Sequence, residues 1–168
     1  MNSYKPKEKF MMTAIEEAKS GSKKLRKYPI GAVVVKGNKI ISRSYNGLPN
    51  NLDPTAHAEI LAIKMAAQKL KTRNLSDCVL YSTNEPCAMC SGAVVWANMG
   101  SIVFGASVKD LEKFWSRRRD KNSSKRRFIF VKSKKIVGKA RPKIFVYGKF
   151  MRAECLKLFD LYDSQLRR

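Results

Sequence analysis

The alternation of apolar and polar positions divides the first two thirds of the chain into helices and strands. Over residues 6–20, apolar side chains recur every three or four positions, which predicts a helix that ends at Gly21. Two β-rich runs, 30–35 and 39–45, are separated by the turn sequence KGN and predict a hairpin. The next apolar runs predict two further helices, over 55–70 and 86–99, and two further strands, over 78–83 and 101–106.

This order of elements predicts an α/β fold in which helices cover the faces of a mixed sheet. The third strand is nearly all apolar, as expected for a strand inside a sheet. After Val108 the periodicity weakens, and no internal repeat is present. The segments expected there are an exposed loop over 116–127, possible strands over 128–131 and 143–147, and an amphipathic closing helix over 150–162.

The length and composition fit one folded domain over residues 1–168, since the chain is 44 % hydrophobic. No apolar run approaches the roughly 18–20 residues that span a bilayer. The N-terminal MNSYKPKEKF has charges where a signal peptide is apolar. We therefore expect a soluble, cytoplasmic protein with no membrane partner. Four cysteines in such a protein favour free thiols or metal ligands over a disulfide framework.

The formal net charge of +22 is the unusual feature of the composition. Residues 113–143 hold 14 lysines and arginines and one acid, Asp120. Such a field attracts polyanions, so this basic segment is a candidate surface for tRNA or another nucleic acid. A solvated lysine-rich surface that reflects biased amino-acid usage explains the charge equally well, and charge alone does not separate the two interpretations.

His57, within PTAHAEIL, is the only histidine. An isolated histidine is usually a packed or surface residue, so its meaning depends on its partners. Cys87 and Cys90 in EPCAMC are one helical turn apart, so both sulfurs can point to the same place. Two thiolates and an imidazole make a three-ligand zinc site with an open fourth position, whereas a structural zinc has four protein ligands. The other cysteines, Cys78 and Cys155, lack this spacing and are expected to be buried core thiols.

Glu59 gives the open position a chemical use. It lies two residues after His57, in the first turn of the predicted helix, so its carboxylate can reach a water at the fourth position without binding the metal. Zinc makes water available as hydroxide at neutral pH, and a nearby carboxylate can carry the proton to a ring nitrogen or a leaving amine. The pattern predicts one catalytic zinc ion per chain, with Glu59 as the catalytic acid and base.

The segments DPTAHAEILAI, LYSTNEPCAMCSGA and VFGA resemble the cytidine deaminase-like superfamily, in the branch of guanine deaminases and tRNA adenosine deaminases. The resemblance covers about residues 5–110, which would be the catalytic core. It implies a three-layer α/β/α sandwich with a central five-stranded sheet, and a homodimer whose active sites lie near the interface. It also implies zinc binding by His57, Cys87 and Cys90, proton transfer by Glu59, and substrate contacts at Asn46, Ala58 and Trp96.

The resemblance leaves the substrate between two possibilities. Trp96, in VWA, matches a tryptophan of guanine deaminases, whereas DPTAHAEI and the positive charge suit a tRNA enzyme. The last third of the chain departs from both patterns. We predict a hydrolytic deaminase of a free nucleobase or nucleoside, a guanine-like purine, with tRNA adenosine as the alternative. A noncatalytic zinc-stabilised nucleic-acid-binding relative is disfavoured, because a structural zinc has no use for Glu59.

Overall fold

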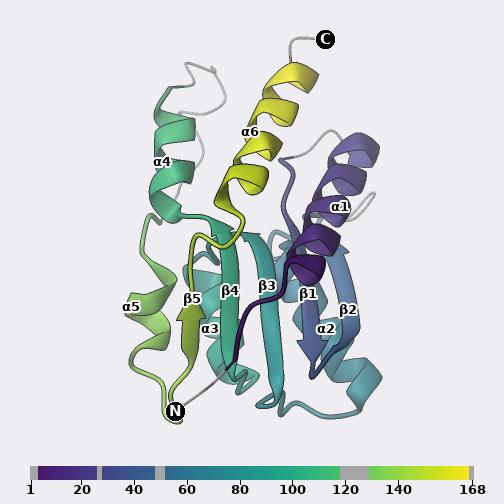
Figure 1. Cartoon of the computed structure of the whole chain (residues 1–168), viewed down its shortest axis with the longest axis vertical. Helices are drawn as coiled ribbons and strands as arrows, with labels where there is room; N and C mark the ends of the chain where they lie inside the picture. Colours follow the sequence, from purple (N-terminus) through teal and green to yellow (C-terminus); the bar gives the residue numbers. More distant parts are fainter. Residues whose placement is uncertain (1–3, 26–27, 48–51, 118–128, 167–168) are drawn as a thin grey trace.

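The computed structural model describes residues 4–25, 28–47, 52–117 and 129–166. Six helices and five strands occur within these residues (Figure 1). Their order and bounds are α1 Glu8–Leu25, β1 Gly31–Lys36, β2 Lys39–Tyr45, α2 Ala58–Leu70, β3 Cys78–Asn84, α3 Ala88–Trp96, β4 Ser101–Ala106, α4 Val108–Ser116, α5 Ser133–Val137, β5 Phe145–Tyr147 and α6 Arg152–Leu166.

The five strands form one mixed sheet in the order β2-β1-β3-β4-β5. β1 is antiparallel to both of its neighbours, whereas β3, β4 and β5 run parallel to one another. Parallel neighbours bring their carboxyl ends to the same edge, so β3 and β4 both end beside the helices that follow them. This edge of the sheet positions the candidate site described below.

Helices pack on both faces of the sheet, which confirms the predicted three-layer α/β/α sandwich (Figure 1). Alternate residues of each strand point to opposite faces. Val33 and Tyr81 pack with α1 and α6 in one core cluster, whereas Val34 and Leu80 pack with α2 and α3 in the other. β3 is therefore buried on both faces, as its apolar run predicts, and so is β4.

Three helix predictions need correction at their ends. α1 continues past Gly21 to Leu25, because this glycine is used for close packing and does not end the helix: a Cβ there would lie 2.4 Å from the Tyr45 ring. α2 and α3 begin later than predicted, since His57 and Cys87 have extended backbones and act as N-caps.

The last third differs more from the sequence-based prediction. α4 was not predicted, and it is capped by reciprocal hydrogen bonds between Ser107 and Asp110. Residues 129–131 form no strand, and α5 follows them. β5 confirms part of the strand expected over 143–147, and α6 confirms the closing helix. Most of the predicted loop, residues 118–127, lies outside the described residues.

Within the described ranges, none of the helices combines the length and the apolar character needed to cross a bilayer.

Candidate metal centre and active site

The residues predicted to bind zinc come together at the N-termini of α2 and α3. His57 is the N-cap of α2, Cys87 is the N-cap of α3, and Cys90 lies in the first turn of α3. His57 Nδ1 lies 3.6 Å from Cys87 Sγ and 3.5 Å from Cys90 Sγ, and the two sulfurs are 3.5 Å apart. Within the described part of the chain, this is the one cluster of its kind suited to a metal ion.

The triangle of ligand atoms has the size that zinc requires. Tetrahedral angles with Zn–S of about 2.3 Å and Zn–N of about 2.0 Å set the sulfur–sulfur separation at about 3.8 Å and the sulfur–nitrogen separation at about 3.5 Å. The observed separations are within a few tenths of an ångström of these values. Two soft thiolates and an imidazole also suit zinc better than magnesium or calcium, which prefer oxygen ligands.

The pKa values of the two thiols shift in opposite directions. The pKa of Cys87 is lowered to about 4, chiefly by its hydrogen-bonding contact with Cys90 and further by its contact with His57. The pKa of Cys90 is raised by the same contact with Cys87 and by burial. The contact with Cys87 also raises the pKa of His57. Zinc binding requires both thiolates, so it is favoured by the lowered pKa of Cys87 and requires the loss of the Cys90 proton.

Glu59 lies beside this triangle and is 2 % exposed. Ser82 Oγ donates to its Oε1 at 3.0 Å, and Cys90 Sγ lies 3.6 Å from its Oε2. Burial raises the pKa of the Glu59 carboxyl, although the nearby His57 opposes that shift. A carboxyl whose pKa is raised towards neutral can both accept and return a proton.

A cavity of about 380 Å³ opens next to these groups. Its walls combine apolar and polar side chains from segments far apart in the sequence. The lining residues are Tyr28, Ile30, Asn46, His57, Glu59, Asn84, Glu85, Cys87, Leu111 and Trp115. A mainly apolar hollow with a few polar groups is the usual form of a small-molecule site, and its size accommodates a purine ring.

The three predicted substrate-contacting residues have different positions. Asn46 lines the cavity, and its backbone N–H donates to the Ile30 carbonyl. Ala58 is fully buried at the start of α2, where the first N–H groups of a helix lack intrahelical acceptors. Trp96 is not brought to this cavity: it is 87 % exposed and borders a separate hollow with Arg73 and Asn98.

Several lining residues were missed from the sequence. Asn84 and Glu85 line the cavity, and Ser82 contacts Glu59. All three follow the apolar start of β3, and this change of polarity was an available signal. Leu111 and Trp115, four residues apart on α4, gave only a short helical pattern.

Glu85 joins the cavity to the last third of the chain. Its Oε2 accepts from the Val108 backbone N–H at 2.9 Å, where α4 begins. Its Oε1 accepts from the Ser133 backbone N–H at 2.8 Å and from the Ser133 hydroxyl at 3.1 Å, where α5 begins. Both carboxylate oxygens are therefore used to hold helices against the cavity.

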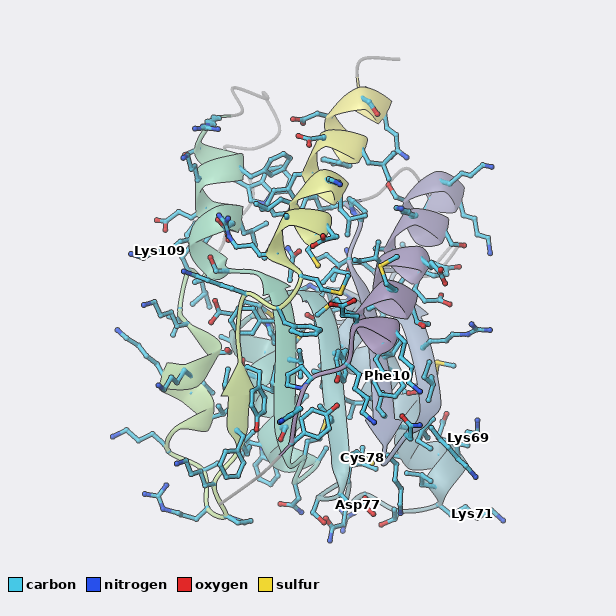
Figure 2. All side chains as sticks on the ribbon, in the orientation of Figure 1. Phe10, Lys69, Lys71, Asp77, Cys78 and Lys109 are labelled. Carbon is cyan, nitrogen blue, oxygen red and sulfur yellow. The ribbon has the colours of Figure 1, made fainter. Side chains whose placement is uncertain are left out.

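The other two cysteines lie away from the metal triangle. Cys78 begins β3, at the opposite end of that strand from the cavity, and Figure 2 shows it beside Asp77 at the lower edge of the sheet. Cys155 is buried in the core cluster of α1 and α6. Both are free thiols, and burial raises the pKa of Cys155 to about 12. They match the prediction of buried core thiols.

Two cysteines and one histidine beside a buried glutamate are the zinc-site arrangement of the hydrolytic nucleobase deaminases. Comparison with known families gives the same answer. Residues 4–106 match the cytidine and deoxycytidylate deaminase zinc-binding region, and the chain belongs to this family. The resemblance inferred from the sequence, the use of zinc and the deaminase activity are thereby confirmed.

The similar sequences include deaminases that are named for each of the two predicted substrates. The tRNA-specific adenosine deaminase of Buchnera aphidicola subsp. Baizongia pistaciae is 35 % identical over 159 residues, which cover 95 % of this chain and 89 % of the relative. The guanine deaminase of Bacillus subtilis is 44 % identical over 82 residues, which cover 49 % of this chain and 53 % of the relative.

The similar solved structures also include both tRNA deaminases and guanine deaminases. A chain from a study of A-to-I editing by tRNA:A34 deaminases at the wobble position of transfer RNA has a TM-score of 0.67 at 30 % identity. The match covers 90 % of this chain and 99 % of that one. The guanine deaminase from Nitrosomonas europaea has a TM-score of 0.71 at 25 % identity, over 96 % of this chain and 86 % of the other. The deaminase function predicted from the sequence therefore fits with either substrate.

Proposed function

We propose that this deaminase acts on adenosine within tRNA and converts it to inosine. The observation that carries the proposal is the extent of the sequence similarity. The match to a tRNA-specific adenosine deaminase runs through 95 % of the chain, including the last third, whereas the match to guanine deaminase covers 49 %. The last third forms part of the cavity wall through Leu111 and Trp115, so it bears on substrate choice.

The proposed roles follow from the positions of the side chains. His57, Cys87 and Cys90 would hold the zinc ion, which when bound supplies a Lewis acid that activates water. Glu59 would take the two protons of that water in turn, giving one to N1 of the base and the other to the departing 6-amino group. The net reaction replaces the amino group by oxygen from water and releases ammonia. Asn46 and the backbone of Ala58 orient the base.

A basic surface beside the cavity supports an RNA substrate. Between residues 129 and 143 all charged residues are cations, and all of them are exposed: Lys132, Lys134, Lys135, Lys139, Arg141 and Lys143. This surface starts at the cavity, because Ser133 is hydrogen-bonded to Glu85 in the cavity wall. A hollow of about 530 Å³ between α5 and β5 continues it. Phosphates of an RNA strand that enters the cavity would contact these cations.

Guanine is the second candidate substrate, and one observation favours it. The guanine deaminase from Nitrosomonas europaea superposes on 96 % of the chain. A direct comparison separates the candidates: A-to-I conversion in an anticodon stem-loop RNA against ammonia release from guanine, with zinc-loaded protein. Efficient turnover of guanine without turnover of the RNA would overturn the tRNA proposal.

A set of charge variants tests the RNA surface in the same assay. Replacing Lys132, Lys134 and Lys135 by serine should lower kcat/KM on the stem-loop by about tenfold or more. It should also flatten the log–log salt dependence by up to about 0.7 for each phosphate that the variant no longer neutralises. The matched control replaces Lys9, Lys19 and Lys23, which are exposed on α1, and removes the same charge. An equal decrease in both variants would mean that net charge alone attracts the RNA.

We also propose that the chain forms one deaminase domain over 1–168 and works as a cytoplasmic homodimer. Exposed apolar side chains on α2 and α3 support the dimer: Met65, Met89 and Trp96 are 47 %, 37 % and 87 % exposed. Large apolar side chains exposed on the helices that cover one face of a sheet favour a protein contact there. In such a dimer Trp96 would serve the interface, and any contact between Trp96 and substrate would be made across it. Free thiols and a tRNA substrate agree with a cytoplasmic location.

A further inference from the structure

The amide of Asn84 has one end without a partner inside the cavity wall. Asn84 is the last residue of β3 and is 3 % exposed. Its Nδ2 donates to the Tyr28 hydroxyl at 3.4 Å, whereas its Oδ1 has no hydrogen-bond partner. Across the described residues, this is the one buried side-chain nitrogen or oxygen left unsatisfied. Buried acceptors are almost always paired, so an exception in a binding cavity indicates a missing donor.

The neighbouring carboxylates do not compete for that donor. Glu59 is contacted by Ser82 and Cys90, and Glu85 holds the starts of α4 and α5 with both of its oxygens. Strand alternation places Asn84 on the same face of β3 as Ser82, the residue that orients Glu59. Asn84 Oδ1 is therefore an uncharged hydrogen-bond acceptor in the wall of the catalytic cavity.

We propose that Asn84 is a substrate-binding residue whose Oδ1 accepts a hydrogen bond from an N–H or O–H group of the bound nucleotide. With the adenosine substrate proposed above, on which this assignment rests, two donors are available: the 6-amino group and the ribose 2′-hydroxyl. A cavity that buries an acceptor disfavours ligands that lack the matching donor, because the acceptor then stays unpaired. Asn84 thereby contributes to substrate choice.

Two variants of nearly equal shape test the acceptor. Asn84→Leu removes the oxygen and should lower kcat/KM on the stem-loop RNA by about 10- to 100-fold. Asn84→Asp keeps an acceptor, to which the Tyr28 hydroxyl can also donate, and should recover most of the activity. Because Asn84→Leu also removes an unsatisfied buried group, its melting temperature should equal or exceed that of the wild type. A residue needed only for packing would not combine unchanged stability with reduced activity.

A change in the substrate shows which donor Asn84 contacts, the 6-amino group or the ribose 2′-hydroxyl. A stem-loop with 2′-deoxyadenosine at the reacting position is compared with the all-ribose stem-loop, for wild type and Asn84→Leu. If the deoxy substitution is costly for the wild type and nearly neutral for the variant, Asn84 contacts the 2′-hydroxyl. If the two reductions in kcat/KM multiply, the contact is with the 6-amino group. Either result supports the proposed acceptor.

The role of Asn84 and the proposed function are tested by different measurements. Wild-type turnover of RNA or guanine decides the function, whereas the ratio of Asn84→Leu to wild type on whichever substrate is used decides the role of Asn84. Activity of Asn84→Leu within about threefold of wild type would overturn the assignment. So would a decrease in activity accompanied by an equal decrease in zinc content or thermal stability, or one that Asn84→Asp does not recover.

Discussion

The proton chemistry of the site depends on the surroundings of a single carboxyl group. Glu59 is almost fully buried, so burial raises its pKa, while the hydroxyl of Ser82 holds one oxygen in place. The second oxygen points to Cys90 and therefore to the metal triangle. These surroundings suit the proton transfer that we propose for Glu59, which is not one of the predicted metal ligands.

Glu59→Gln should lower kcat by at least about 10²-fold, because the amide cannot accept and return a proton. Zinc content and melting temperature should stay close to those of the wild type, since His57, Cys87 and Cys90 are untouched. Turnover and elemental analysis on the same preparation check both statements. Glu16→Gln, an exposed position on α1, is the control. Near-normal turnover of Glu59→Gln would assign the proton transfers to another group.

The zinc content of the protein should depend on Cys87 and Cys90. Wild-type protein should contain one zinc ion per chain, and Cys87→Ser combined with Cys90→Ser should contain almost none, since serine is a far weaker zinc ligand than a thiolate. Cys78→Ser, at the other end of β3, should keep the metal. Elemental analysis after removal of loosely bound metal gives the ratio. Full zinc content in the double variant would place the metal elsewhere.

At the scale of elements, α4 completes the cavity although its sequence carries little signal. Ser107 and Asp110 cap its start, and Glu85 accepts from its first backbone N–H. Arg152 of α6 then donates to Asp110 from its Nε at 3.0 Å. These contacts fix the helix so that Leu111 and Trp115 face the cavity.

The Asp110 contacts give a pH-dependent contribution to stability. Hydrogen bonds from Arg152, and secondarily from Ser107, lower the pKa of Asp110 to about 2, against 3.8 for a free aspartate. A lowered folded-state pKa means that the contribution is complete above about pH 4 and is lost as the pH falls towards about 2. Asp110→Asn should therefore cost roughly 0.5–1.5 kcal/mol at pH 7, less at pH 3, and almost nothing at pH 2.

Thermal or denaturant unfolding of wild type and Asp110→Asn across pH 2–7 measures that difference. Arg152→Gln should show the same trend, because it removes the other partner of the pair. A destabilisation that stays constant over the whole pH range would mean that the charge of Asp110 does not stabilise α4.

The metal triangle and the core could be predicted from the sequence because their signals are local. His57 and Glu59 lie within one helical turn, as do Cys87 and Cys90, and the strand periods appear in continuous runs. The cavity wall could not be predicted, because Tyr28, Asn84 and Trp115 meet only after the sheet has formed. Gly21 was misread for a similar reason: its close approach to Tyr45 depends on tertiary packing.

At the scale of the whole molecule, the two faces of the sandwich differ in what covers them. α1 and α6 enclose one core with aromatic side chains, in which the Tyr28 ring packs at a tilt against Phe159 and edge-to-face against Tyr162. α2 and α3 cover the other face and leave Met65, Met89 and Trp96 exposed on their outer side. Basic side chains project around much of the periphery, as Figure 2 shows for Lys69, Lys71 and Lys109.

This asymmetry predicts where self-association occurs. The wild type should sediment with twice the mass of one chain, and Trp96→Glu should shift it towards the monomer, because a carboxylate is costly in a buried apolar interface. Met12→Glu, which places the same charge on the exposed side of α1, is the control. Analytical ultracentrifugation at several concentrations distinguishes the species. A Trp96→Glu dimer as tight as the wild type would place the interface on another face.

The hydrogen bonds of Glu85 have a consequence for how such enzymes diversify. The family match ends at residue 106, and Glu85 hydrogen-bonds to the first residue of each of the next two helices, α4 and α5. Because Glu85 accepts from two backbone N–H groups, which almost any residue can supply, the sequences of α4 and α5 can vary while the metal centre is retained. A graft of 107–143 from a relative with another substrate should therefore keep its zinc when residue 85 remains glutamate, and lose its docking when Glu85 is replaced by alanine.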